Sequence, residues 1–129
     1  MNDLIEKYPD DVDLVYDLGV LHGEAEDQDR ALGFMDQVLS RKPDHYSALN
    51  YVGYTWAERG ERLEEAETMI RRAIELKPDD GYIIDSLGWL YYQRGLKQIA
   101  EGQGDAARAS FQSAIEQLER ALAQLDKGD

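Results

Sequence analysis

Three stretches align without gaps and decide the fold: "LVYDLGVLHG" (14–23), "ALNYVGYTWA" (48–57) and "IIDSLGWLYY" (83–92). Each carries a glycine between large apolar residues, and these glycines, Gly19, Gly53 and Gly88, are 34 and 35 residues apart. A glycine inside a helix costs about 1 kcal/mol relative to alanine. Three glycines in register therefore indicate that another segment lies close against each of them.

The three prolines keep the same period. Pro9, Pro43 and Pro78 are again 34 and 35 residues apart, and an aspartate follows each one. Proline suits the break between two helices because it lacks the N–H that a helix interior needs. The aspartate after it can cap the next helix or complement its positive N-terminal end. The pattern predicts a helix end, a stop and a new helix start in each period.

A second aligned pair lies between these stretches. "RALGFMDQVLSRKP" (30–43) and "EAETMIRRAIELKP" (65–78) have apolar residues at three- and four-residue spacing, which is typical of amphipathic helices. Each period is therefore a helix, a short turn and a second helix. The first helices are expected at about 12–25, 46–60 and 81–100, and the second helices at about 28–41, 63–76 and 105–126.

This pattern resembles the tetratricopeptide repeat family, on the small residues Gly19, Gly53, Gly88, Ala31 and Ala66 and on the closing prolines. The resemblance implies an all-α fold, a right-handed α-solenoid of about three helix-turn-helix repeats. It covers nearly the whole chain, which we interpret as one tetratricopeptide repeat domain, 1–129. The expected repeats are approximately 12–45, 46–80 and 81–126, with residues 1–8 as the tail of a preceding helix.

The third repeat departs from the pattern, and two registers are open for its second helix. In one, Ala107, Phe111 and Ala114 form the small-large-small set, with a longer loop around Gly95. In the other, the set is Ala114, Leu118 and Ala121, with 14 extra residues. We favour the second, in which each arm of the last hairpin is extended by about two turns. The segment "EGQGD" (101–105) would then be the turn, with Asp105 as the helix cap.

The two ends of the array look different. The last helix has one apolar and one polar side, which suits the end of a stack because a terminal unit needs a solvated outer face. Leu14 and Leu21 lie together on one side of the first helix, with only a fragment of a helix before them. The chain is thus expected to be the C-terminal part of a longer array, or a homo-oligomer through this N-terminal edge.

Several aromatic and acidic side chains are not needed by a packed hairpin. In the resembled family, the first helices line a concave groove that often holds an extended peptide or a helix of a partner. On the corresponding face, Tyr and Trp favour contact and carboxylates attract Lys or Arg. Ser86 and Gln93 share this face. The predicted partner-binding residues are Asp13, Tyr16, Asp17, Val20, Asn50, Tyr51, Tyr54, Tyr82, Asp85, Trp89 and Tyr92. The alternative is that these aromatics only pack against adjacent repeats.

Composition narrows the function further. A net charge of −13, from 27 acidic and 14 basic residues, argues against nucleic acid and anionic membranes as partners. The chain has no cysteine, no apolar run of the ~18 residues that span a membrane, and no metal, phosphate-loop or nucleophile motif. We expect no enzyme activity and no cofactor. No targeting signal is visible at the start, so the default is a cytoplasmic protein, or an exported one if a signal was removed.

The sequence therefore predicts a non-catalytic protein-protein interaction scaffold. It would bind a basic or apolar peptide segment or helix of a partner in an aromatic, acidic groove. The alternative is a self-association module of a longer repeat protein with no external peptide ligand.

Overall fold

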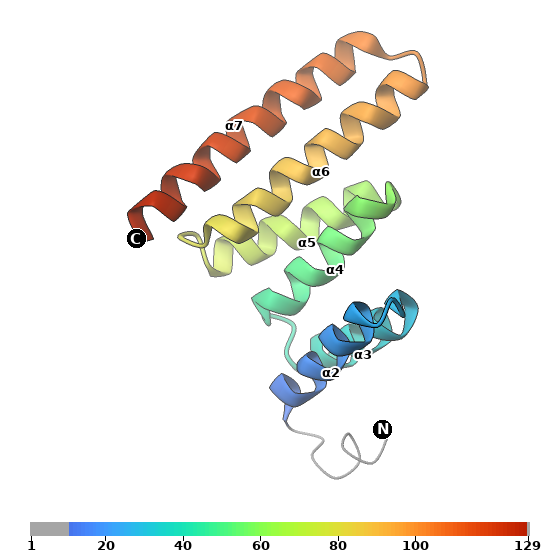
Figure 1. The fold of residues 1–129 in the computed structure, drawn as a ribbon, viewed down its shortest axis with the longest axis vertical. Helices are drawn as coiled ribbons and strands as arrows, with labels where there is room; N and C mark the ends of the chain where they lie inside the picture. The colour runs from blue at the N-terminus through green and yellow to red at the C-terminus, as the bar shows by residue number, and fades with distance from the viewer. Residues whose placement is uncertain (1–10, 129) are drawn as a thin grey trace.

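The computed structural model describes residues 11–128, and within them six helices pair into three hairpins (Figure 1). The hairpins are α2 (Val12–Glu24) with α3 (Gln28–Arg41), α4 (Tyr46–Arg59) with α5 (Leu63–Leu76), and α6 (Gly81–Ala100) with α7 (Gly104–Gly128). They follow one another along the long axis of the molecule, with α2 and α3 at one end and α7 outermost at the other. The all-α repeat fold expected from the sequence is confirmed. The helix tail expected at residues 1–8 lies outside the described residues.

Side chains cap the first helix of each hairpin, one residue later than the aspartate that follows each proline. The Asp11 carboxylate accepts from the Leu14 N–H at 3.0 Å, His45 Nδ1 accepts from Ala48 N–H at 3.1 Å, and Asp80 accepts from Tyr82 N–H at 2.9 Å. These residues satisfy N–H groups that have no partner inside the helix.

The close approach of the two helices in each hairpin explains the 34- and 35-residue spacing of these glycines. A Cβ built on Gly19 would lie 2.7 Å from Met35, one on Gly53 would lie 2.6 Å from Ile70, and one on Gly88 would lie 2.9 Å from Leu118. A side chain at any of these glycines would require the facing residue or the helix backbone to shift. Met35, Ile70 and Leu118 are therefore equivalent positions in the three second helices.

This equivalence decides the register of the third repeat. The backbone oxygen of Ala114 lies 3.3 Å from the same Cβ position on Gly88, so the favoured set of Ala114, Leu118 and Ala121 is the one the structure adopts. α6 has 20 residues and α7 has 25, against 13 or 14 in the other helices, and the hairpin runs past the ends of α4 and α5 (Figure 1). The expectation that Asp105 caps α7 was wrong. The helix begins at Gly104, and Asp105 lies within its first turn.

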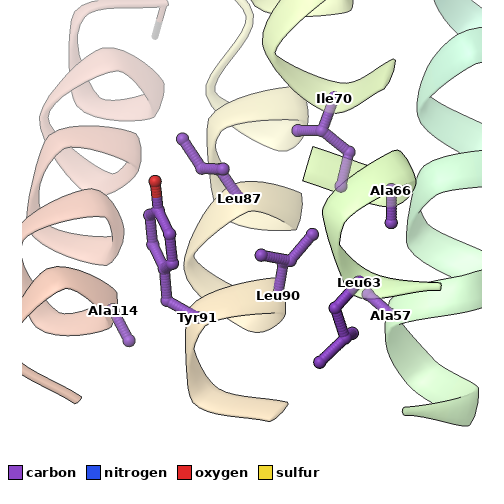
Figure 2. Close-up of a cluster of buried hydrophobic side chains, with 8 residues drawn as sticks. All are labelled: Ala57, Leu63, Ala66, Ile70, Leu87, Leu90, Tyr91 and Ala114. Atoms are coloured by element: carbon purple, nitrogen blue, oxygen red, sulfur yellow. The ribbon is translucent and has the colours of Figure 1, made fainter. Parts of the chain in front are cut away.

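The main core lies where α6 packs between α5 and α7 (Figure 2). Leu87 and Leu90 of α6 meet Ile70 of α5, while Tyr91 lies toward Ala114 of α7. Ile70, Leu87 and Leu90 are 1% exposed or less, and burial of each such side chain contributes about 1.5–3 kcal/mol. This core joins the second and third hairpins, and a second cluster, of α2, α3 and α4 side chains, joins the first and second.

The polar side of the last helix is exposed, as its sequence predicts for the end of a stack. Part of its apolar side is exposed as well. Its alanines Ala107, Ala114 and Ala121 are buried, but Leu118 and Leu122 are 42% and 61% exposed. The larger residues Phe111, Leu118 and Leu125 also pack against glycines of α6.

Candidate functional site

The eleven candidate residues all lie on α2, α4 and α6, the first helices of the three hairpins. We call the surface formed by these residues the inner face. Their exposure differs widely. Tyr82 is 72% exposed, Tyr54 is 37% exposed and Asp85 is exposed, whereas Trp89 and Tyr16 are partly buried.

In the middle of the inner face, Tyr54 of the second hairpin lies near Asp85 of the third. Burial raises the pKa of the Tyr54 hydroxyl, and the carboxylates of Glu58 and Asp85 raise it further. Glu58 is one turn along the same helix, whereas Asp85 comes from α6. Tyr54 is therefore neither sealed in the core nor remote from the third hairpin.

At the N-terminal end, Asp13 and Tyr16 meet the start of α4. His45 Nε2 lies 3.3 Å from the Asp13 carboxylate, and its ring centroid lies 5.1 Å from that of Tyr16. A pocket of ≈ 320 Å³ opens here, lined by these three residues together with Asp17, Lys42, Asp44, Tyr46 and Ser47. Three of the lining residues are aspartates against one lysine, so the pocket suits a basic group.

Two candidates are engaged in packing between hairpins. Val20 is partly buried against the core formed by α2, α3 and α4. Tyr51 packs against the same core, and its hydroxyl fills the space beside Gly23, where a Cβ would lie 1.9 Å from the oxygen. The pKa of this hydroxyl is raised by burial and by Glu24. Tyr51 of α4 therefore packs against the end of α2.

At the C-terminal end, Trp89 and Tyr92 form an aromatic pair. Their ring centroids are 5.2 Å apart, and Tyr92 lies 6.0 Å from Phe111 of α7. The indole N–H of Trp89 is buried with no hydrogen-bond partner within residues 11–128. This pair links the inner face to the last helix.

Asn50 lies on α4 between these ends. Its side chain is partly buried, and its carbonyl oxygen has no hydrogen-bond partner among the described residues. An unsatisfied buried carbonyl oxygen costs free energy, and a hydrogen-bond donor from a bound segment or from water would remove that cost.

Ser86 does not belong to the free surface where its spacing had placed it. It is 4% exposed and its hydroxyl donates to the Tyr82 carbonyl oxygen at 3.3 Å. A small side chain that hydrogen-bonds to the preceding turn can be buried in a helix without another partner. The pattern of α6 therefore overstated the width of the inner face by one position.

A polar cluster that the sequence did not predict joins α5 to α6. The Glu67 carboxylate accepts hydrogen bonds of 2.8 Å from Arg71, Tyr91 and Arg94, and Arg71 also bonds to the Tyr91 hydroxyl. Partial burial alone would raise the pKa of Glu67. The hydrogen bonds from Arg94, Arg71 and Tyr91 outweigh it and lower this pKa to about 2. Only the pair Glu67 and Arg71, four residues apart, was a detectable signal in the sequence.

Within residues 11–128, no helix combines the length and apolar character required to cross a membrane. The described surface thus offers aromatic rings, carboxylates and the Asn50 amide. This chemistry suits docking of a protein segment.

Comparison with known proteins supports the repeat assignment. The tetratricopeptide repeat family model matches residues 58–80. The chain is 38% identical over 97 residues to a TPR repeat-containing protein of Pseudomonas aeruginosa, an alignment that covers 75% of this chain and 16% of that protein. It is 30% identical over 100 residues to the photosystem I assembly protein Ycf3 of Rippkaea orientalis, with coverage of 67% and 57%. The chain spans less than two thirds of the length of both relatives.

Proteins with these repeats are generally scaffolds for protein–protein interaction rather than catalysts. The three stacked helical hairpins, the matching family model and the similarity to a repeat-containing relative agree with one another. Together they support assignment of this chain to the tetratricopeptide repeat family.

Proposed function

We propose that this chain is a non-catalytic scaffold whose inner face docks a basic or apolar segment of a partner protein. Tyr54 carries the proposal, because this ring remains exposed while Asp85 of the next hairpin lies close enough to raise its pKa. An aromatic anchor beside carboxylates offers contact area together with attraction for Lys or Arg.

The eleven residues divide into three groups under this proposal. Tyr54, Tyr82 and Trp89 supply aromatic contact, and Asn50 supplies hydrogen bonds to a peptide backbone. Tyr51 and Val20 hold the hairpins in place behind them. The remaining residues, Asp13, Tyr16, Asp17, Asp85 and Tyr92, surround these anchors and make the surface acidic and aromatic.

A peptide library tests this function without knowledge of the natural partner. Random peptides displayed on phage are selected on the folded chain, and enriched sequences are synthesised for calorimetry. We expect enrichment of Lys or Arg beside apolar residues, and depletion of Asp and Glu. The combined substitutions Tyr54→Ala and Trp89→Ala should weaken binding of the selected peptide by about 2 kcal/mol or more.

Charge reversal supplies a matched control. Asp85→Lys should weaken binding of a basic peptide, whereas Glu75→Lys, an exposed acid on α5, should leave it unchanged. Selection of acidic peptides, or binding that is insensitive to both Tyr54 and Trp89, would rule out the inner face as the docking surface.

A role in assembly is the second candidate. One relative is named as an assembly protein, and both relatives are longer than this chain. At the N-terminal edge Leu21 is 65% exposed, so it is available for contact with a second copy or with a preceding repeat. Association through this edge requires that Leu21→Glu abolish it, whereas an unchanged mass for Leu21→Glu would exclude this edge as the contact between copies.

A further inference from the structure

The last helix carries a row of large apolar residues that packs against the glycines of α6 along one edge and remains exposed along the other. Ile115, Leu118 and Leu122 are 48%, 42% and 61% exposed, and Phe111 and Leu125 are partly buried at either end. The spacing of the five is four, three, four and three residues, so they form one straight row along α7. Leu96 and Ile99 of α6 continue the apolar surface at the tip of the hairpin. We call these seven residues the hairpin face.

The same chain shows that this position is normally covered. Met35 and Ile70 occupy the places of Leu118 in the first two hairpins, each against the glycine of its partner helix. Both are 0% exposed, because the following hairpin packs over them. The hairpin face therefore continues an interface that the molecule already uses twice.

The helix that covers Ile70 shows what such a surface accepts. α6 places Ile83, Leu87 and Leu90 over α4 and α5, at a spacing of four and three residues. Phe111, Ile115 and Leu118 of α7 have the same spacing, and Ile115 and Leu118 remain 48% and 42% exposed. We infer that the occupant of the hairpin face is the hairpin face of a second copy of this chain, so that two α7 helices pack against each other in a two-fold dimer.

The row is self-complementary when the two helices run antiparallel. Four of its residues, Phe111, Ile115, Leu118 and Leu122, are centred between Ile115 and Leu118, which is also the middle of α7. Ile115 of each copy then meets Leu118 of the other, and Phe111 meets Leu122. At the tip, a hollow of ≈ 400 Å³ is lined by Ile99, Ala107, Phe111, Ile115 and nearby polar residues. The exposed Leu122 of the second copy enters this hollow.

Charges at the edge of the row favour the antiparallel arrangement. Arg108 lies at the tip end, Asp126 lies at the opposite end, and Glu119 lies between them. All three are exposed, and none forms an ion pair within residues 11–128. The antiparallel dimer places Arg108 of each copy against Asp126 of the other, whereas a parallel pair would place like charges together.

Two exposed leucines provide a matched test. Leu122 is 61% exposed on α7 and Leu21 is 65% exposed on α2, at the other end of the stack. By sedimentation equilibrium, the wild-type chain of 14.7 kDa should reach twice that mass. Leu122→Glu should weaken the dimer by at least about tenfold, because it buries an unpaired carboxylate. Leu21→Glu should leave the dimer intact, with unchanged helical circular dichroism in both variants.

The inference is overturned if the wild-type chain stays monomeric at every concentration, as it would if the hairpin face took a helix of another protein or a further helix of a longer chain. It is also overturned if Leu21→Glu dissociates the dimer and Leu122→Glu does not. Neither result would affect peptide binding by Tyr54 and Trp89, so the two proposals fail independently.

The absence of native cysteine allows a test of orientation. In the antiparallel dimer the two copies of position 115 are offset by about 4–5 Å along the axis, and the two copies of position 122 by about 16 Å. Ile115→Cys should therefore form an intermolecular disulfide on mild oxidation, and Leu122→Cys should not. Equal cross-linking of both variants would overturn the antiparallel arrangement.

Discussion

The hydroxyl of Tyr91 on α6 donates a 2.8 Å hydrogen bond to the carboxylate of Glu67 on α5. Arg71 and Arg94 bond to the same carboxylate from the two helices, so one acidic group fastens the second hairpin to the third. The side chain of Glu67 is 22% exposed, which limits its screening by solvent. We therefore expect the charge of Glu67 to contribute to the stability of the stack.

Replacement of this acid should destabilise the fold. Glu67→Gln keeps the shape but removes the charge from three hydrogen bonds, and we expect a loss of about 1–2 kcal/mol in the free energy of unfolding at neutral pH. Urea denaturation measures it. Glu64→Gln, an exposed acid one turn earlier in α5, should change stability by less than about 0.5 kcal/mol. Equal effects of the two variants would mean that the cluster contributes nothing.

The same cluster predicts a pH dependence. Since the pKa of Glu67 is lowered from 4.5 to about 2, the folded state favours the ionised form more than the unfolded state does. Its contribution is fully present above pH ~4.5 and is lost as the pH falls from there toward about 2. The stability difference between the wild type and Glu67→Gln should therefore shrink over this window. A difference that stays constant down to pH ~2 would contradict the lowered pKa.

Glycine substitutions should separate close packing from helix propensity. In Gly53→Ala the new Cβ would lie 2.6 Å from Ile70 and 3.0 Å from the Ala66 backbone oxygen, so we expect a loss of about 1–3 kcal/mol. In Gly33→Ala, on the exposed side of α3, nothing lies within 4 Å, and stability should rise by up to about 1 kcal/mol. Thermal denaturation of the two variants should give midpoint shifts of opposite sign.

Neighbouring aspartates should differ as helix caps. Asp80 accepts from the N–H groups of Tyr82 and Ile83, whereas Asp79 makes a partly exposed ion pair with Lys77 at 3.6 Å. Asp80→Ala should lower the free energy of unfolding by about 1 kcal/mol, and Asp79→Ala should lower it by less than about 0.5 kcal/mol. Chemical denaturation resolves a difference of this size, and the reverse order would show that the cap is misplaced.

Asn50 should show opposite effects on stability and binding. Asn50→Leu removes a buried oxygen that lacks a partner, so we expect unchanged or higher stability. The same change removes the proposed hydrogen bonds to a docked peptide backbone and should weaken binding of a selected peptide by about 1 kcal/mol or more. Retained affinity in calorimetry would assign Asn50 to structure alone.

The candidate site was less predictable from the sequence than the fold. Periodicity places Tyr54, Tyr82 and Trp89 on first helices because helical spacing is local. It does not show how far the following hairpin covers each ring. Tyr51 and Tyr54 are three residues apart, yet the hydroxyl of one fills a gap beside Gly23 while the other ring stays exposed. That difference depends on contacts between segments distant in the chain.

The sequence by itself determined the helices and the register of the first two hairpins, because glycine, proline and apolar spacing act through short-range geometry. For the third hairpin it left two registers open, and the contact of Ala114 and Leu118 with Gly88 in the tertiary structure decided between them. Only the tertiary structure decided the convergence of Glu67, Tyr91 and Arg94, and the exposure of Leu118 and Leu122. These depend on how neighbouring hairpins lie over one another, and so on which surfaces the stack encloses and which it leaves open.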